Sequence, residues 1–170
     1  MKRTKILVFS DTHGYLENAL SAIESHPDLD VVLHLGDCQK DFEKIKLACL
    51  DGSLKVNKRS IRFHGVLGNI DHGEVGAQEL LLDIMGTKIF MTHGHKYRVK
   101  SSDDIIYYRG REVGADIVLF GHTHVAYKAD YDELVVLNPG SISLPRGGTG
   151  PSYLVLEVSN INVSEEIYFL

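Results

Sequence analysis

The sequence contains no long hydrophobic run. The first apolar stretch after the basic start of the chain spans only Ile6 to Phe9, far too short for a signal-peptide core or a membrane-spanning helix. Cysteine is also scarce, because the chain has only Cys38 and Cys49, which lack the spacing of a metal-binding motif. This scarcity excludes a disulfide framework and agrees with a reducing compartment. We therefore expect a cytoplasmic protein that does not enter a membrane.

Positive charge is in short supply as well. The chain has 18 Lys and Arg against 23 Asp and Glu, and its formal net charge is −5. Surfaces that bind nucleic acids normally carry a basic surplus, so the sequence has no strong nucleic-acid signature. A small anionic substrate remains compatible with this balance if positive charge is arranged locally.

Length and composition predict one globular domain over residues 1–170. With 44% hydrophobic and 24% charged residues, the chain is long enough for one well-buried core and too short for two. Apolar runs of strand length alternate with amphipathic segments, which is typical of β-α-β units and of the α/β fold class. The pattern predicts helices over 15–25, 41–50 and 102–113, a hairpin over 80–84 and 88–92, and strands over 125–129, 134–137, 153–158 and 163–169. Two packed sheets flanked by helices fit this order.

Five short apolar runs share one feature: each ends in a small residue and is followed at once by a side chain that can bind a metal. These side chains are Asp11, Asp37, Asn69, His93 and His122. Strand carboxyl ends gather along one edge of an open sheet, where α/β proteins place their sites. Taken singly, Asp11 could be a helix N-cap and Asn69 part of a plain turn. As a set, the five predict a metal centre at one sheet edge.

Three motifs extend this set by pairing ligand types two residues apart. They are Asp11-x-His13, His93-Gly94-His95 and His122-x-His124. In extended or loop backbone, residues i and i+2 point the same way, so each pair can hold one ion. Mixed oxygen and nitrogen ligands suit Mn, Fe, Zn or Ni better than calcium or a metal selected by thiolates.

Together with Gly36-Asp37 and Gly68-Asn69, these motifs resemble the calcineurin-like metallophosphoesterase superfamily. The segments 138–141 (Asn-Pro-Gly-Ser) and 145–146 (Pro-Arg) are similar to the tail of its small bacterial and archaeal phosphodiesterase branch. The resemblance implies a four-layer α/β/β/α sandwich with two mixed sheets, and two divalent metal ions. By position it implies Asp11, His13, Asp37 and His124 for one ion, and Asp37, Asn69, His93 and His122 for the other, with Asp37 as the bridge.

The charges of that ligand set indicate a phosphate site. Two divalent ions bring four positive charges, of which Asp11 and Asp37 remove two, so a positive pocket remains. Two adjacent metals can hold a bridging hydroxide as nucleophile and neutralise the oxygens of an in-line displacement. Because no activated serine or cysteine is recognisable, we predict a dinuclear phosphoesterase that hydrolyses a small phosphoester directly. Manganese is the favoured metal, and the branch resemblance alone favours a diester.

One position departs from the family pattern. In many members a histidine directly follows the metal-binding asparagine and helps to protonate the leaving group or to hold the phosphate, whereas here that residue is Ile70. His95 is our first candidate for the missing proton donor, with Asp71 and His72 behind it. Asp71 can instead orient a metal ligand from behind.

Two side chains are predicted to touch the substrate. Asn69 is expected to do so beside the metal, and Arg146 could clamp a phosphate oxygen. A loop salt bridge is about equally compatible with the position of Arg146.

A second class of function stays open. A eukaryotic trafficking scaffold shares this small fold and uses it as a protein-interaction surface, so the fold alone does not establish catalysis. In such a scaffold we expect some of the metal-binding residues to be replaced, whereas every expected ligand is present here. A metal-binding protein with little catalysis, and a homo-oligomer built on exposed edge strands, both remain compatible with the sequence.

Overall fold

The computed structural model of the protein describes residues 2–54 and 61–170, and within these ranges it contains two five-stranded mixed sheets. The first sheet has the strand order β10-β9-β1-β2-β3. Its strands are β1 (Arg3–Phe9), β2 (Val31–His34), β3 (Arg62–Gly65), β9 (Ser152–Ser159) and β10 (Val163–Phe169). The strands β1, β2 and β3 run parallel, while β9 and β10 pair antiparallel.

The second sheet has the strand order β4-β5-β6-β8-β7. Its strands are β4 (Glu79–Ile84), β5 (Thr87–Thr92), β6 (Ile117–Leu119), β7 (Ala126–Tyr131) and β8 (Leu134–Pro139). The three inner strands β5, β6 and β8 run parallel, and the edge strands β4 and β7 are antiparallel to their neighbours. Both sheets therefore present the carboxyl ends of three parallel strands.

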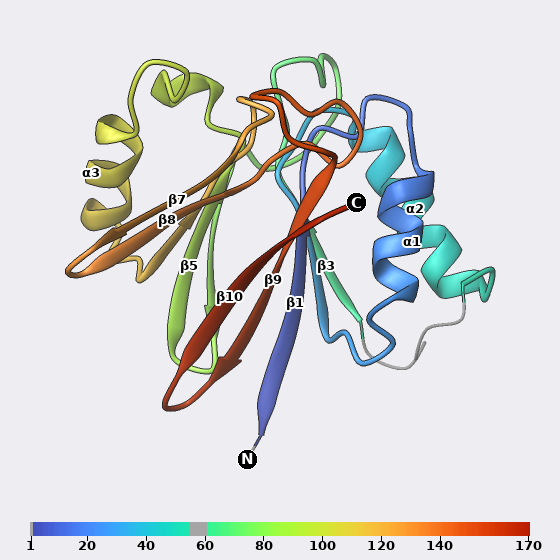
Figure 1. Cartoon of the computed structure of the whole chain (residues 1–170), viewed down its shortest axis with the longest axis horizontal. Coiled ribbons are helices and arrows are strands. Elements are labelled where there is room, and N and C mark those ends of the chain that lie inside the picture. The colour runs from blue at the N-terminus through green and yellow to red at the C-terminus, as the bar shows by residue number, and fades with distance from the viewer. Residues whose placement is uncertain (1, 55–60) are drawn as a thin grey trace.

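Helices cover the outer face of each sheet (Figure 1). The helices α1 (Glu17–Glu24) and α2 (Gln39–Asp51) lie on the first sheet, and α3 (Asp104–Glu112) lies on the second. This arrangement confirms the four-layer α/β/β/α sandwich. Within the described ranges, no helix is long and apolar enough to span a membrane.

The apolar strands pack on both of their faces. In β1, Ile6 and Val8 join the core between the two sheets, whereas Leu7 and Phe9 join the core beneath α1 and α2. A strand buried on both faces reads as a continuous apolar run instead of an alternating one. The layered fold thus follows from the uninterrupted runs that precede the ligand residues.

The predicted elements are found with small shifts at their ends. The hairpin of β4 and β5 is present, and its turn residues Met85 and Gly86 have φ angles of 55° and 87°. The third apolar run differs, because β3 ends at Gly65 and the run from Val66 to Gly68 lies beyond it. The reason is that β2 stops at His34, so the ladder has no partner strand further along.

Candidate metal centre

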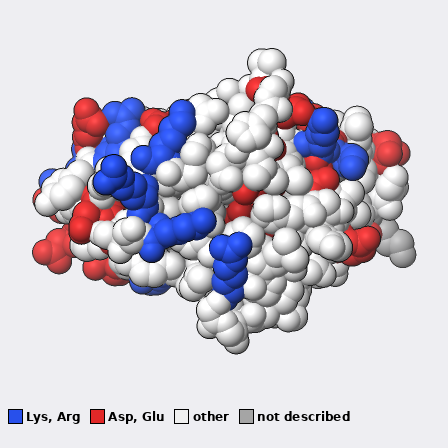
Figure 2. Space-filling model, turned by 90° about the horizontal axis from the view of Figure 1, so that it is seen from above, with Lys and Arg blue, Asp and Glu red and all other residues white. Residues whose placement is uncertain are grey.

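The predicted ligands meet at one edge of the molecule and come from both sheets. Asp11, Asp37 and Asn69 follow β1, β2 and β3 of the first sheet, and His93 and His122 follow β5 and β6 of the second. Figure 2 looks down on this edge, where acidic atoms lie in the middle of the face and Lys and Arg gather over the α3 half. The centre therefore lies between the two sheets.

The ligand loops share an unusual backbone. The φ angle is 58° at Asp11, 47° at His13, 62° at Asp37, 67° at His122 and 61° at His124. A positive φ is uncommon for residues other than glycine and clusters at functional sites, where surrounding structure holds the strained conformation. These turns let the chain leave a strand and bring a side chain back across the sheet edge.

The small residues before the ligands are required by close packing. A Cβ atom at Gly68 would lie 2.0 Å from Asp37 Oδ1, and one at Gly121 would lie 2.9 Å from Asp11 Oδ2 and closer still to Ser10 Oγ. Any larger side chain would therefore displace a carboxylate of the site. This explains why glycine precedes these ligands.

One group of ligand atoms consists of Asp11, His13 and His124, whose atoms lie within 4.8 Å of one another. The Nε2 atom of His124 is 3.2 Å from Asp11 Oδ1 and 3.2 Å from His13 Nε2. All three belong to the set that the resemblance implies for the first ion.

The second group consists of Asp11, Asp37 and His93. His93 Nε2 lies 3.3 Å from Asp37 Oδ1 and 3.2 Å from Asn69 Oδ1. The other oxygen of Asp37, Oδ2, lies 3.8 Å from His13 Nε2. Asp37 therefore spans both groups with one oxygen each, and Asp11 also belongs to both.

Two of the imidazoles are oriented by backbone carbonyls. The Nδ1 atom of His93 donates to the carbonyl of Leu35 at 2.7 Å, and the Nδ1 atom of His124 donates to that of Leu144 at 2.7 Å. Such a partner fixes the tautomer and leaves Nε2 free to bind a metal. In both residues Nε2 points into the ligand groups.

The carboxylates of the site remain ionised. Burial by itself raises the pKa of Asp37, but contact with His93 and the N–H of Ile70 outweigh burial, and the pKa falls to about 2. The pKa of Asp11 is also lowered, because contact with His124 and the charge of His93 overcome the opposing effect of burial. The centre thus offers two negative charges to a cation.

The ring of His122 lies beside the second group, 5.0 Å from His93 between ring centroids. Among the described residues, His122 belongs to neither of the two ligand groups. Burial and then the charges of His93 and Lys100 lower its pKa to about 4. Its imidazole is therefore neutral near pH 7, the form that a metal requires.

The donor set fits divalent ions. Asp11 Oδ1 is buried and has no hydrogen-bond partner in the described part of the chain, although a buried carboxylate oxygen without a partner is costly. The same atom lies 3.2 Å from His124, 3.8 Å from His13 and 3.9 Å from His93. A cation among these atoms would satisfy it.

Asp71 lies behind the ligands and accepts backbone N–H groups. Its Oδ1 accepts from Cys38 at 2.9 Å and Gln39 at 2.7 Å, and its Oδ2 accepts from Asp37 at 3.1 Å and Gly68 at 2.7 Å. The carboxylate thus ties the loop after β2 to the loop that carries Asn69.

The other predicted site residues surround the ligands without joining them. The ring of His95 lies 5.4 Å from that of His93 and 6.1 Å from that of His122, and its Nδ1 is buried without a partner among the described residues. Ile70 is 44% exposed, and His72 is exposed. The side chain of Arg146 is exposed beside the centre, where its backbone N–H donates to the carbonyl of His124.

Sequence reasoning missed two supports of the Asp11 loop. Asp41 is buried at the start of α2 and accepts from the N–H of Gly14 at 2.6 Å and the hydroxyl of Thr12 at 2.9 Å. The hydroxyl of Ser143 donates to the carbonyl of Thr12 at 2.8 Å. The acidic residue four places after Asp37 was a visible signal for Asp41, whereas nothing in the sequence singles out Ser143.

Fold and site together define the class of protein. Residues 4–161 match the family model described as the calcineurin-like phosphoesterase superfamily domain, and the chain belongs to this superfamily. It is 32% identical over 165 residues to the probable metallophosphoesterase YsnB of Bacillus subtilis (strain 168), which covers 96% of this chain and 89% of that protein. It is 30% identical over 175 residues to the phosphodiesterase YfcE of Escherichia coli (strain K12), which covers 94% of this chain and 90% of that protein.

Two solved structures illustrate the likeness in fold. A conserved uncharacterized protein of Streptococcus pneumoniae TIGR4, a predicted phosphoesterase, aligns with a TM-score of 0.77 at 27% identity over 99% of this chain and 91% of that one. Wild-type Vps29 of Entamoeba histolytica, complexed with Zn²⁺, aligns with a TM-score of 0.74 at 21% identity over 97% of this chain and 98% of that one. The second likeness establishes the fold alone.

Proposed function

We propose that the protein is a dinuclear metal-dependent phosphodiesterase that hydrolyses a small phosphoester by direct attack of water on phosphorus. The observation that carries this proposal is the pair of ligand groups that share Asp11 and are spanned by Asp37. These two carboxylates balance only two of the four charges of two divalent ions, so a loaded centre attracts phosphate. The relation to the phosphodiesterase YfcE favours a diester over a monoester.

The residues are assigned to the ions as follows. Asp11, His13, Asp37 and His124 would hold one ion, and Asp37, Asn69, His93 and His122 the other. When bound, two divalent ions supply positive charge to the phosphoryl oxygens and acidify the attacking water. Mn is favoured, and Ni, Fe and Zn suit the same nitrogen and oxygen donors.

We assign proton donation to His95. Its ring lies beside those of His93 and His122, and its buried Nδ1 has no hydrogen-bond partner among the described residues. Burial, and then the charges of His93 and Lys96, lower its pKa, so its protonated form is scarce at neutral pH. Esters with good leaving groups should therefore react best. Asn69 is the proposed contact to the reacting phosphate, and Arg146, exposed beside the centre, is the proposed contact to a further phosphate oxygen of the substrate.

Hydrolysis of two chromogenic esters tests the proposal. Protein freed of metal and reconstituted with Mn, Ni, Fe, Zn or Mg is offered bis-p-nitrophenyl phosphate and p-nitrophenyl phosphate. We expect metal-dependent release of nitrophenolate with preference for the diester, and loss of activity in Asp37→Asn but not in His72→Gln. Single turnover in oxygen-18 water should place the label in the phosphate product. Strong preference for the monoester would overturn the choice of a diesterase, and phosphate oxygen drawn from the enzyme would overturn direct attack.

A second candidate is a metal-binding or metal-free protein-interaction scaffold with little catalysis. The fold likeness to Vps29 favours it, whereas the full ligand set favours catalysis. Hydrolysis assays on metal-loaded protein separate the two, and metal titration by calorimetry then distinguishes a metal-binding scaffold from a metal-free one. No hydrolysis of either ester would support the scaffold.

We place this activity in the cytoplasm. Cys38 and Cys49 are free thiols. Burial, as the largest cause, and nearby aspartates raise the pKa of each thiol to about 11. Neither is therefore a ready thiolate for disulfide exchange. Such cysteines need no oxidising compartment.

A further inference from the structure

A pocket of about 430 Å³ adjoins the metal centre on the side of the second sheet. Its volume lies in the range of small-molecule sites. Thr123, which stands between His122 and His124, forms part of its wall, and so does Arg146, whose backbone N–H donates to His124 at 2.9 Å. We call this cavity the Phe120 pocket. Because Thr123 belongs to the loop that carries both histidines, the pocket lies next to the place where the proposed centre would hold a phosphate.

One part of the wall of the Phe120 pocket is apolar and is formed by Val99, Phe120, Val125 and Tyr127. Phe120 and Val99 are only 3% and 8% exposed, so most of the aromatic surface open to a ligand belongs to Tyr127, which is 37% exposed. The ring of Tyr127 is 6.1 Å from that of Phe120 and inclined to it by 60°. Such a wall suits a flat organic group, because aromatic rings pair favourably when tilted or offset.

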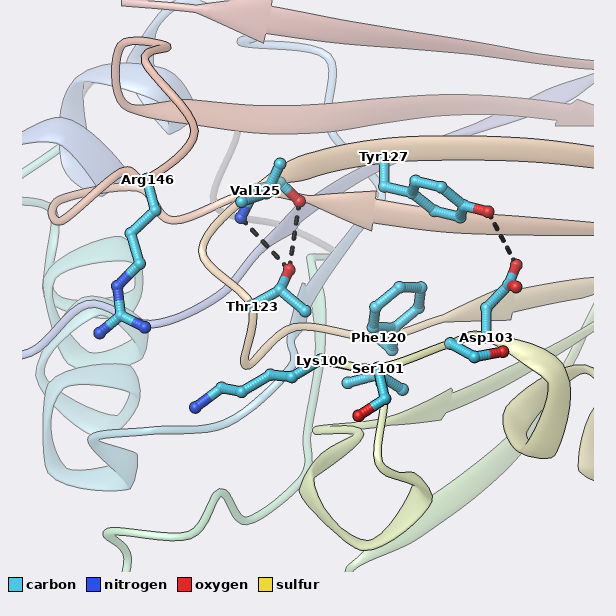
Figure 3. A pocket seen from close by; sticks show the side chains of 10 residues that line it. Lys100, Ser101, Asp103, Phe120, Thr123, Val125, Tyr127 and Arg146 are labelled. Atoms are coloured by element: carbon cyan, nitrogen blue, oxygen red, sulfur yellow. Dashed lines mark hydrogen bonds between the residues drawn. The ribbon is translucent and has the colours of Figure 1, made fainter.

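The two ends of the Phe120 pocket differ in charge. Lys100 and Arg146 extend toward one end, and Tyr127 donates its hydroxyl to Asp103 at the other, with Phe120 and Thr123 between them (Figure 3). The cationic end is the one beside the candidate metal centre, because the backbone N–H of Arg146 donates to the carbonyl of His124.

Neither cation is neutralised by the protein. Within the described ranges, Lys100 and Arg146 form no ion pair, whereas other cations, such as Lys128 and Arg109, do. The carboxylate of Asp103 is instead held by the hydroxyls of Tyr127 and Tyr131, each at 2.9 Å. Two unpaired cations beside the candidate metal centre would attract a negatively charged group.

We propose that the Phe120 pocket binds a nucleotide-like substrate, in which Lys100 and Arg146 hold a second phosphoryl group and the apolar wall holds an aromatic ring. This inference rests on the proposed function, because it places the reacting phosphate of the diester at the metals. Guanidinium and ammonium groups make strong charge-assisted hydrogen bonds to phosphate. The tyrosine and aspartate at the far end offer a hydroxyl and a carboxylate to the polar edge of the ring.

Two thymidine esters test the second phosphoryl site. Thymidine 5′-(p-nitrophenyl phosphate) and its 3′-phosphorylated form differ only in that group. Wild-type enzyme should show a KM about tenfold lower for the 3′-phosphorylated ester, a ratio that the double variant Lys100→Gln/Arg146→Gln abolishes. The control variant Lys88→Gln/Arg62→Gln, with two exposed cations replaced elsewhere, should keep the ratio. An unchanged ratio in the pocket variant would overturn the proposal.

Equilibrium binding separates this inference from the proposed function. By calorimetry without metal, thymidine 3′-monophosphate should bind about tenfold tighter than thymidine, which lacks the phosphoryl group, or propyl phosphate, which lacks the ring. That advantage should vanish in the pocket variant. Such binding without hydrolysis of either ester would refute the phosphodiesterase and leave the pocket assignment standing. Hydrolysis with equal binding of all three ligands would do the reverse.

Discussion

Asp71 shows how one buried carboxylate can set the position of a proposed metal ligand by binding the backbone of that ligand and not its side chain. Four backbone N–H groups converge on it, including those of Asp37 and Gly68. The Gly36-Asp37 turn packs so tightly against Gly68 that a Cβ at Gly68 would meet Asp37. We therefore propose that Asp71 is a positioning residue, the second of the two roles that the sequence left open.

Replacement of Asp71 by Asn should loosen both loops. The amide keeps one acceptor oxygen, but its NH₂ group faces two N–H donors and the negative charge is lost. We expect a loss of about 3 kcal/mol in the free energy of unfolding and about tenfold or more in metal affinity. Urea denaturation and metal titration measure the two effects.

The matched control for Asp71→Asn is Asp83→Asn. Asp83 is exposed and accepts a single N–H, from Gly86 at 3.0 Å, so its replacement should change little. If Asp71→Asn kept normal metal affinity and slowed only esters with poor leaving groups, Asp71 would be the proton donor instead.

His34 is a second residue with a global effect. It is fully buried, and neither ring nitrogen has a hydrogen-bond partner among the described residues. Its ring stacks on Phe42 at 5.1 Å between centroids. Burial lowers its pKa from 6.5 to about 4, so the folded protein resists protonation of this ring.

Stability should therefore fall in mildly acidic solution. Below pH 6.5 the unfolded chain gains a proton at His34 while the folded chain does not until about pH 4. The contribution is complete above pH 6.5, falls between pH 6.5 and 4, and amounts to about 3 kcal/mol in all. Urea denaturation of metal-free His34→Leu should show a shallower dependence on pH over this window. The exposed His72→Leu should follow the wild type, and an identical profile for His34→Leu would contradict the assignment.

At the scale of elements, periodicity and turn residues predicted the helices and the hairpin. The predicted helix 102–113 and the observed α3 (Asp104–Glu112) differ by two residues at the start and one at the end. The third strand lies earlier in the chain than the apolar run 66–68 that predicted it. The end of a strand depends on the length of its partner strand, which no local sequence pattern contains. Close packing between elements, such as that at Gly110, could not be predicted from the sequence either.

Gly110 lies inside α3, where glycine is unfavourable. A Cβ there would lie 2.4 Å from Val118 Cγ2 and 3.1 Å from Leu134, so the helix approaches β6 closely. Gly110→Ala should therefore lower the free energy of unfolding by about 1 to 3 kcal/mol despite the better helix propensity. In a Val118→Ala background, which restores the space, the same change should be neutral or stabilising. Equal losses in both backgrounds would exclude the steric cause.

At the scale of the whole molecule, the candidate metal centre draws its residues from both sheets. The apolar runs along the chain predicted that these side chains meet at one edge, because each of the five first noted follows such a run. Their spatial grouping was less accessible: Asp11 belongs to both ligand groups, and five ligands adopt positive φ. These features arise from contacts between distant segments, such as that of Asp11 with His122, 111 residues further along the chain.

Metal binding should stabilise the entire fold, because its ligands come from both sheets. At a metal concentration about 100 times the Kd, one site adds about 3 kcal/mol, which corresponds to a rise of about 5 to 10 °C in Tm. Calorimetry with Mn before and after chelation measures it, and hydrogen exchange should slow at the ends of both β1 and β5. Asp37→Asn should reduce the rise, and protection limited to one sheet would contradict a shared centre.

The positive φ angles at the ligand positions also restrict how this sequence can drift. Apart from glycine, the residues that adopt this conformation most readily are Asn, Asp and His, all three of which bind metals. At Asp11, Asp37 or His124, a tolerated replacement is thus either another ligand or glycine. His93 is buried without this restriction, so an apolar residue fits there. A descendant that gave up metal would be expected to carry glycines in its loops and an aliphatic side chain after β5, a pattern that a sequence comparison can recognise.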